Sequence, residues 1–202
     1  MLTLIKKFLI ILIIEFIFCY GAMADTCNEI LDHLNDIKSI TTEFSEMIYY
    51  NDNTILQHGN ILVQKPGKMR IDYNEPRKIS IFLKNDMITY YDHELDEVTK
   101  LKQHQRFLSF LSKTNIDLNK EFNNHECNIK GNKQILTLYY KEDEDDIKLQ
   151  LIFLKYNLNI VNIYINNIQK STIKLYNTIT NAKIDNDKLT FKDKQFFNIY
   201  ND

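Results

Sequence analysis

The stretch Lys65–Asp92, KPGKMRIDYNEPRKISIFLKNDMITYYD, decides the fold of this chain. It holds both prolines of the protein, Pro66 and Pro76, in a sequence that has only four glycines. The pair Pro66-Gly67 is typical of a tight turn, because proline fixes φ near about −65° and glycine accepts positive φ. Asn85-Asp86 is typical of a two-residue hairpin turn. Pro76 is expected to end a strand, since proline cannot donate to a sheet ladder.

Between these turns, side chains alternate with the period of two that is typical of β-strands. Met69, Ile71 and Tyr73 alternate with charged residues, and a second strand is expected over residues 79–83. Residues 87–91 are expected to return as its hairpin partner. The same pattern predicts strands over residues 39–50, 54–64, 98–103, 135–140, 147–155, 158–166, 171–177 and 189–192.

Three segments change to a helical period. Residues 26–38 place Ile30, Leu31, Leu34 and Ile37 on one face. Thr26 or Asp25 is expected to cap this helix, and Glu29 stands in the capping-box position relative to Thr26. A short and very apolar helix is expected over residues 105–113, and one or two helical turns within residues 115–124. A terminal helix, hairpins, a small helical insert and more hairpins predict a mainly β fold with helices (α+β), an antiparallel sheet or half-barrel.

Several expected strands carry apolar residues on both faces, for example ISIFL at 79–83 and LQLIFL at 149–154. A sheet with one face in water alternates more cleanly. Two readings follow from this pattern. One face lines a hydrophobic cavity of the kind that binds lipid, or both faces pack in an ordinary β-sandwich core.

Composition excludes some classes of protein. The chain has 202 residues, of which 44% are hydrophobic, which argues against disorder and allows one domain with a sizeable core. The net charge of −2 argues against nucleic-acid binding through phosphate neutralisation.

The first 24 residues resemble a secretory signal. Lys6 and Lys7 precede an apolar run that Glu15 interrupts, and Ala22-Met23-Ala24 forms an A-x-A cleavage site. We expect export through the Sec pathway, cleavage after Ala24 and a mature domain over residues 25–202, with a net charge of −3. The alternatives are a membrane anchor and lipidation at Cys19, which lacks small residues before it.

After cleavage, two cysteines remain, Cys27 and Cys127. Two cysteines in an exported protein suggest one disulfide, and the alternative is two free thiols. His125 beside Cys127 lacks further metal ligands at useful spacing, so no metal site and no cofactor are expected. The acidic run at 142–146 is interpreted as a charged hairpin tip rather than a cation site.

Signatures of catalysis are missing from the sequence. His93-Glu94 lacks the second histidine of a zinc-protease motif. The chain has no G-x-S-x-G nucleophile elbow and no P-loop. We therefore expect a protein that is not an enzyme, and a secreted hydrolase is the disfavoured alternative.

A series of residues across the mature chain carries a family resemblance. They are Phe44, Gly59, the run from Lys65 to Arg70, Tyr73 to Pro76, Asp86 to Asp92, Leu95, Val98, and the tail from Leu175 to Ile184 followed by Leu189 to Phe191. In order and spacing, this chain resembles the outer-membrane lipoprotein carrier protein LolA family of Gram-negative bacteria.

The resemblance implies an unclosed antiparallel β-barrel with a helical lid over a hydrophobic cavity. It implies a periplasmic chaperone that binds the acyl chains of lipoproteins released from the inner membrane. The implied partners are acylated lipoproteins, an inner-membrane ABC transporter complex (LolCDE type) and an outer-membrane receptor (LolB type). The chain itself is expected to be a monomer. A free-lipid shuttle of the same fold is the alternative function.

The resemblance also implies site residues. The family has an arginine before the turn proline that is tied to lid closure and ligand release, and this chain has Lys65 there, with Arg70 as a second candidate. Lysine lacks the planar fork of arginine. For the cavity lining, the expected residues are Phe44, Met69, Ile71, Ile81, Leu83, Ile88 and Tyr90. For the lid helix, they are Phe107, Leu108, Phe110 and Leu111.

Overall fold

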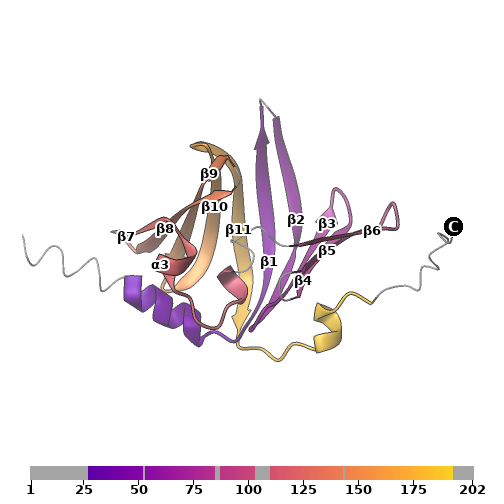
Figure 1. The fold of residues 1–202 in the computed structure, drawn as a ribbon, viewed down its shortest axis with the longest axis horizontal. Coiled ribbons are helices and arrows are strands. Elements are labelled where there is room, and N and C mark those ends of the chain that lie inside the picture. Colours follow the sequence, from indigo (N-terminus) through magenta and orange to yellow (C-terminus); the bar gives the residue numbers. More distant parts are fainter. Residues whose placement is uncertain (1–26, 52, 85–86, 103–109, 143, 193–202) are drawn as a thin grey trace, which may run out of the picture. The chain divides into compact units, whose positions relative to one another are not determined.

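A computed structural model of the protein describes residues 27–51, 53–84, 87–102, 110–142 and 144–192. Its strands form one open antiparallel sheet of eleven strands in the order β6-β5-β4-β3-β2-β1-β11-β10-β9-β8-β7 (Figure 1). The predicted mainly β fold with an unclosed sheet is confirmed. The strands are β1 (Ser39–Tyr50), β2 (Asn53–Gln64), β3 (Lys68–Glu75), β4 (Ile79–Lys84), β5 (Met87–Asp92), β6 (Glu97–Lys102), β7 (Asn124–Lys130), β8 (Lys133–Glu142), β9 (Asp145–Leu154), β10 (Asn157–Ile165) and β11 (Ile168–Thr180).

The turns predicted from the central stretch lie where the sequence places them. Gly67 has a φ of 68° in the turn between β2 and β3, and β3 ends at Glu75, directly before Pro76. Lys84 pairs with Met87 across β4 and β5, which leaves two residues for the hairpin loop, as expected. The loop residues themselves lie outside the described part of the chain.

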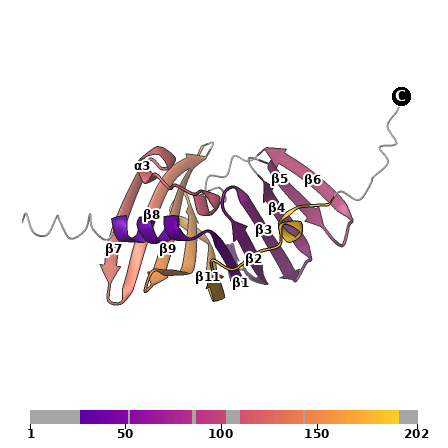
Figure 2. The ribbon, with the colours of Figure 1, turned by 90° about the horizontal axis from the view of Figure 1, so that it is seen from below.

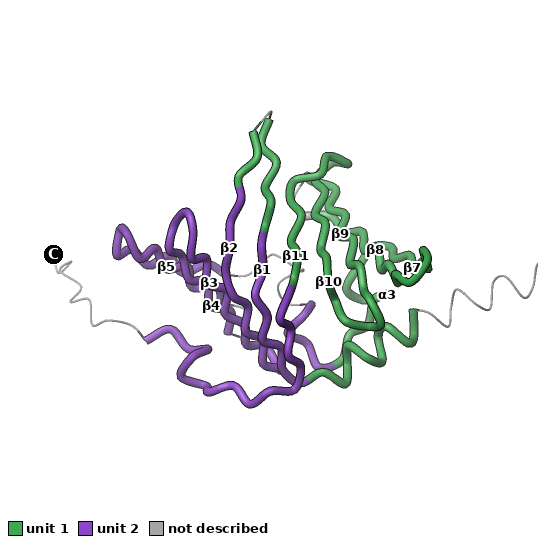
Figure 3. Tube along the Cα trace, turned by 180° about the vertical axis from the view of Figure 1, so that it is seen from behind, with its two compact units in different colours: residues 1–37, 46–55, 115–175 green, residues 38–45, 56–114, 176–202 purple. Residues whose placement is uncertain are grey.

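The chain divides into two compact units, coloured separately in Figure 3. Unit 1 contains residues 1–37, 46–55 and 115–175, and unit 2 contains residues 38–45, 56–114 and 176–202. Each unit has its own buried residues and its own helical segment.

In unit 1, residues 27–36 form a helix that runs across the strands (Figure 2). Of its predicted apolar face, Ile30 and Leu34 are buried and Leu31 is half-buried, and Ile37, directly after the helix, is buried as well. The strands β8, β9 and β10 bury a row of facing side chains, because directly opposite residues of antiparallel strands share a face. Leu136 pairs with Leu151, which pairs with Val161, and all three are at most 2% exposed.

A second helix of unit 1, α3 (Leu118–Glu121), is about one turn long and lies within residues 115–124, as expected. Asn123 N–H already donates to the carbonyl of Tyr139 at 2.8 Å, and β7 begins at the next residue. The ring of Phe122 meets Tyr140 with centroids 5.9 Å apart. Pairing with β8 therefore ends the helical segment before Asn123.

In unit 2, strands β3 to β6 form a meander with no shift of register in its β3–β4, β4–β5 and β5–β6 pairs. The prediction of a strand over residues 189–192 is wrong. Residues Asn186–Leu189 form the 3-10 helix η1, and the carboxylate of Asp185 accepts a hydrogen bond from the N–H of Asp187 at 3.1 Å. Leu189 is 1% exposed, because this turn packs on β3 instead of adding to the sheet (Figure 2).

Candidate functional site

One face of unit 2 collects the apolar residues that the sequence indicated as a lining. Met69, Leu83 and Ile88 form one row across β3, β4 and β5. The next row is formed by Ile71, Ile81 and Tyr90. Cross-strand partners and residues two apart lie on the same face, so all six side chains share it. We call this the inner face.

Burial differs along the inner face. Met69 and Leu83 are each 2% exposed and form a cluster with Val63 of β2. Ile71 and Ile88 pack against that cluster and are half-buried. Beyond it, Ile81 and Tyr90 are also half-buried. The inner face thus has a closed apolar centre and a partly open apolar margin.

Phe44 of β1 joins the same face. Its ring lies over Gly59, where an added Cβ would come within 2.6 Å of a ring carbon. The ring also meets Tyr73 edge-on, with centroids 5.2 Å apart. Since Gly59 pairs with Tyr73 in the row next to Ile71, the structure brings all seven residues of the expected lining together.

A helical segment covers the centre of the inner face. Residues 110–112 are helical, Phe110 is fully buried, and Leu111 packs against the cluster of Val63, Met69 and Leu83. The other two expected lid residues, Phe107 and Leu108, lie outside the described residues. The described end of the expected lid helix therefore lies on the expected lining.

The turn at residues 65–67 holds this helical segment. Gly67 N–H donates to the carbonyl of Ser112 at 2.8 Å, and Lys65 N–H donates to the carbonyl of Lys38 at 2.9 Å. The Lys65 side chain is half-buried, and burial lowers the pKa of its amine from the ordinary value. Lys65 thus lies where the covering segment is attached to the sheet.

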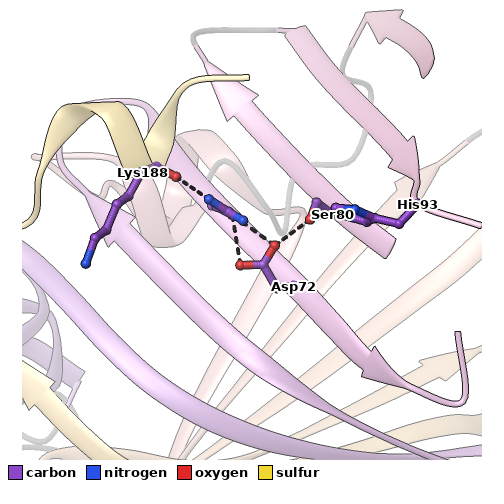
Figure 4. Close-up of polar contacts among 5 residues, drawn as sticks. Asp72, Ser80, His93 and Lys188 are labelled. Carbon is purple, nitrogen blue, oxygen red and sulfur yellow. Dashed lines mark hydrogen bonds and ion pairs between the residues drawn. The ribbon is translucent and has the colours of Figure 1, made fainter. Parts of the chain in front are cut away.

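Arg70 projects from the opposite face of the same strands, which we call the outer face. Its Nε lies 2.9 Å from Asp72 Oδ1, and its Nη1 donates to the carbonyl of Lys188 at 3.0 Å (Figure 4). Its guanidinium also lies 5.0 Å from the centroid of the Phe82 ring. The structure therefore does not bring Arg70 together with the inner-face residues.

Polar groups continue along the outer face from Asp72. The Ser80 hydroxyl donates to Asp72 Oδ1 at 2.5 Å and lies 2.8 Å from His93 Nε2 (Figure 4). The serine stands between the acid and the histidine, whereas a nucleophilic triad places the histidine between them. In this arrangement the Ser80 hydroxyl connects Asp72 of β3 to His93, which follows β5.

Asp92 closes the turn between β5 and β6. Burial alone would raise the pKa of its carboxyl group, but hydrogen bonds from the N–H groups of Leu95 and Glu94 hold that pKa below its ordinary value. The positive charge of Arg77 acts in the same direction, and so does the neighbouring His93. Arg77 forms an ion pair with the same carboxylate. The ionised form of Asp92 is therefore the one that the fold uses.

Comparisons with known proteins identify the family of this chain. The family model described as "Outer membrane lipoprotein carrier protein LolA" matches residues 35–192. This chain belongs to the LolA family. Two relatives are similar to this chain over nearly their whole length. An uncharacterised protein of Rickettsia prowazekii (strain Madrid E) is 25% identical, covering 95% of this chain and 90% of that protein. An outer-membrane lipoprotein carrier protein of Legionella pneumophila (strain Corby) is 27% identical, covering 93% and 94%.

A solved structure supports the fold of this LolA-family chain. It is the crystal structure of a "putative outer membrane lipoprotein-sorting protein domain" from Vibrio parahaemolyticus. The TM-score is 0.53 at 6% sequence identity, covering 84% of this chain and 96% of that one. At this identity, the likeness concerns the fold alone.

Unit 1 of this LolA-family chain contains the disulfide between Cys27 and Cys127, with their Cα atoms 5.5 Å apart. The bond joins the N-terminal helix to β7. On the same helix, Glu29 accepts a hydrogen bond from the Tyr156 hydroxyl at 2.8 Å, and Asn35 accepts one from Ile116 N–H at 3.0 Å. The helix is thereby fixed to unit 1 at its start and near its end.

Two groups of residues were missed by sequence reasoning. Ile40 and Ile61 also pack against the inner-face cluster. They stand in the period-two pattern of their strands, so the signal was present. The segment from Lys188 to Phe191 covers the outer face, and no local periodicity indicates that placement.

Within the described ranges, no group of three or more His, Cys, Asp or Glu side chains could hold a metal ion. No helix among the described residues is long and apolar enough to span a membrane.

Proposed function

We propose that this protein is a periplasmic carrier that shields the acyl chains of lipoproteins between the inner membrane and an outer-membrane receptor. The observation that carries the proposal is the inner face of unit 2, where seven apolar residues from β1, β3, β4 and β5 gather. Membership of the LolA family supports the lipoprotein as the cargo. The Legionella relative bears the name of an outer-membrane lipoprotein carrier protein.

The inner face has the chemistry that an acyl chain requires. Each CH₂ group taken out of water gains about 0.8 kcal/mol, so a chain in an aqueous compartment needs a continuous apolar surface. Ile71, Ile81 and Tyr90 provide half-buried apolar surface beside the closed centre of the face. We assign these three residues to first contact with the acyl chain. Met69, Leu83 and Phe44 then form the buried apolar surface on which the acyl chain rests.

An acyl chain can bind at the centre of the inner face only if Leu111 moves, because Leu111 packs against the cluster at that position. The helical segment 110–112 is therefore the part of the lid whose displacement admits cargo. Phe107 and Leu108 belong to the same lid in this proposal. The turn that contains Lys65 holds the segment through the Gly67 to Ser112 hydrogen bond. We assign Lys65 to this latch.

Arg70 has a different role in this proposal. Its bonds to Asp72 and to the carbonyl of Lys188 attach the C-terminal segment to the outer face. We therefore assign Arg70 to stability and not to ligand release. A variant that lacks the Arg70 side chain but remains folded would therefore still bind acyl chains.

The proposed pathway follows from the cargo. Residues 1–24 act as a cleaved signal that delivers residues 25–202 to the periplasm as a monomer. An inner-membrane ABC transporter complex (LolCDE type) supplies the lipoprotein, and an outer-membrane receptor (LolB type) accepts it. The carrier transfers its cargo without forming or breaking a covalent bond, so no catalytic residue and no cofactor are required.

A crosslinking experiment tests the inner face directly. A photoreactive amino acid is placed at Ile71 on the inner face, or at Leu62 on the outer face of the neighbouring strand. The two positions are matched, because both are half-buried and Leu62 pairs with the residue next to Ile71. We expect the Ile71 variant to crosslink to a radiolabelled acyl chain of a lipoprotein and the Leu62 variant not to. Equal crosslinking at the two positions would refute the inner face as the binding surface.

A further inference from the structure

Ser171 of β11 buries a hydroxyl group that has no hydrogen-bond partner. The residue is 5% exposed, and none of the described residues donates to its Oγ or accepts from it. Ser39 is equally buried, but its hydroxyl donates to the carbonyl of Ala182 at 2.6 Å. Ser80 is 2% exposed and donates to Asp72 Oδ1 at 2.5 Å. Because an unpaired polar group in the interior lowers stability, a purely structural role at position 171 would favour an apolar side chain.

The side chains around Ser171 are apolar. Directly opposite residues of neighbouring strands share a face, so Ser171 belongs to a row with Ile163 of β10, Leu149 of β9 and Leu138 of β8. Ile173, two residues further along β11, lies on the same face. We call these five residues the serine patch. Its four apolar side chains offer the hydroxyl no hydrogen-bond donor or acceptor.

A bulge in β11 directs Ser171 onto this face. The partner of Ser171 is Ile163, but the next residue of β10 pairs with Gln169, which leaves Lys170 as an extra residue. In a regular strand, Gln169 and Ser171 would share a face. The Gln169 side chain instead donates to Thr172 Oγ1 at 2.7 Å, on the face opposite the serine patch. Bulges re-aim side chains next to functional sites, and this one turns a hydroxyl from the polar face to the apolar face.

The serine patch is closed at one end and partly open at the other. Leu138 and Leu149 are at most 1% exposed, whereas Ile163 and Ile173 are half-buried. A serine side chain turns about a single bond between staggered positions, so its Oγ can reach a group that lies on the two isoleucines. A ligand at this patch therefore presents an apolar surface to Ile163 and Ile173 and one hydrogen-bond acceptor to the Ser171 hydroxyl.

An acyl carbonyl group combines these properties. It lies directly at the end of a hydrocarbon chain, and its oxygen accepts the single hydrogen bond that a hydroxyl donates. A carboxylate has about four acceptor sites, and burial of its charge against apolar side chains is costly. An ether-linked chain lacks the carbonyl oxygen. The arrangement thus favours a chain in ester or amide linkage over a free fatty acid and over an ether.

We propose that the Ser171 hydroxyl donates a hydrogen bond to the carbonyl oxygen of an acyl ester or amide whose chain lies on Ile163 and Ile173. A bound carbonyl satisfies the unpaired hydroxyl, so the gain in affinity arises only when the chain carries this linkage. The inference rests on the proposed binding of acyl chains and adds to it the selection of acylated molecules over other apolar chains.

The test compares two neutral probes of the same chain length, the ester 1-dodecanoyl glycerol and the ether 1-O-dodecyl glycerol. Isothermal titration calorimetry with the mature chain measures both affinities, with each probe kept below the concentration at which it aggregates. We expect the wild type to bind the ester about fivefold to tenfold more tightly than the ether. Dodecanoate, which ends in a carboxylate, should bind more weakly than the ester.

Two serine variants locate the recognition. In Ser171→Ala, the affinity for the ester should fall to that for the ether, and the affinity for the ether should stay as in the wild type. Ser39→Ala is the matched control, because Ser39 is equally buried but already bonded, and it should keep the preference for the ester. Urea denaturation of the unbound chains should show a lower midpoint for Ser39→Ala but not for Ser171→Ala. Circular dichroism shows that each variant is folded.

Three binding results would overturn the inference and leave the proposed function standing. They are equal binding of the ester and the ether by the wild type, an ester preference that survives Ser171→Ala, and tighter binding of dodecanoate than of the ester. A midpoint that falls as far in Ser171→Ala as in Ser39→Ala would show that the hydroxyl is already bonded in the unbound chain, and it would overturn the inference as well. Binding of none of the probes would overturn the inference together with the proposed function.

Discussion

At the scale of single residues, close packing decides which side chains are permitted on the inner face. Gly59 lies beneath the Phe44 ring, and an added Cβ would meet the backbone oxygen of Asp72 at 2.0 Å. A backbone atom cannot turn aside as a side chain can. The glycine is therefore required by the neighbouring ring and strand and not by its own backbone conformation.

The first prediction concerns Gly59→Ala. The added methyl group forces the Asp72 backbone and the Phe44 ring apart, so we expect the free energy of unfolding to fall by about 1–3 kcal/mol. Urea denaturation followed by circular dichroism measures this change. Gly131→Asn is the control. Gly131 has a φ of 64° and no atom within 4 Å of the added Cβ, and asparagine tolerates this conformation. A larger loss in the Gly131 variant would contradict the packing argument.

The second prediction concerns Lys65 and pH. Burial lowers the pKa of Lys65 in the folded chain below the ordinary value of 10.5. Between these two values the unfolded chain binds more protons than the folded one, so this residue makes the free energy of unfolding rise with pH. Lys65→Met removes this contribution. From about pH 8 to about pH 10, the wild type should gain stability relative to the variant, by less than about 1 kcal/mol because the side chain is partly solvated.

Urea denaturation at the two pH values measures that gain. Lys113→Met, at another lysine near the lid, controls for general alkaline effects on stability. A difference between the wild type and Lys65→Met that stays constant or falls with rising pH would show that burial does not disfavour the charged amine.

At the scale of elements, most strands could be predicted from the alternation of apolar residues and from the turn residues between them. The turns at Pro66-Gly67 and before Pro76, together with the two-residue spacing between β4 and β5, were predictable because each depends on local backbone chemistry. The residues of the inner face could be predicted as a set. The side of the sheet on which they lie could not, because it depends on the pairing between strands. The position of Arg70 could not be predicted, because its partner, the carbonyl of Lys188, is 118 residues away.

The third prediction concerns η1. Leu189 is 1% exposed, and the turn that carries it packs against β3. Leu189→Ala removes buried apolar volume, so we expect the free energy of unfolding to fall by about 2–4 kcal/mol. Urea denaturation of residues 25–202 measures the loss. Leu101→Ala, at a leucine that is 55% exposed on β6, should change stability little. Equal losses in the two variants would show that the C-terminal segment does not hold to the outer face.

At the scale of the whole molecule, a long covalent link supplements the sheet. Cys27 and Cys127 are 100 residues apart, and their bond fixes the N-terminal helix to β7 within unit 1. The sequence suggested this bond from the number of cysteines in an exported chain. It could not place the helix face against the strands, because that contact depends on which residues of β7 to β10 are buried.

The fourth prediction concerns reduction of this bond. In the chain-entropy model, opening a loop of this length lowers the free energy of unfolding by about 4–5 kcal/mol. Urea denaturation with and without dithiothreitol should show this difference. Cys27→Ser/Cys127→Ser should match the reduced wild type and be insensitive to dithiothreitol. Equal stability of the oxidised and reduced wild type would show that the bond does not constrain the chain.

We propose that this protein carries acylated lipoproteins on its inner face. To test this function, the mature protein, residues 25–202, is incubated with spheroplasts that hold newly made lipoproteins in their inner membrane. We expect an acylated lipoprotein to appear in the supernatant bound to the wild type. We expect no release by Ile81→Asn, which places a polar group among the apolar residues of the inner face. If the folded wild type released no lipoprotein while still binding free fatty acids, its cargo would be free lipid and the proposed function would be wrong.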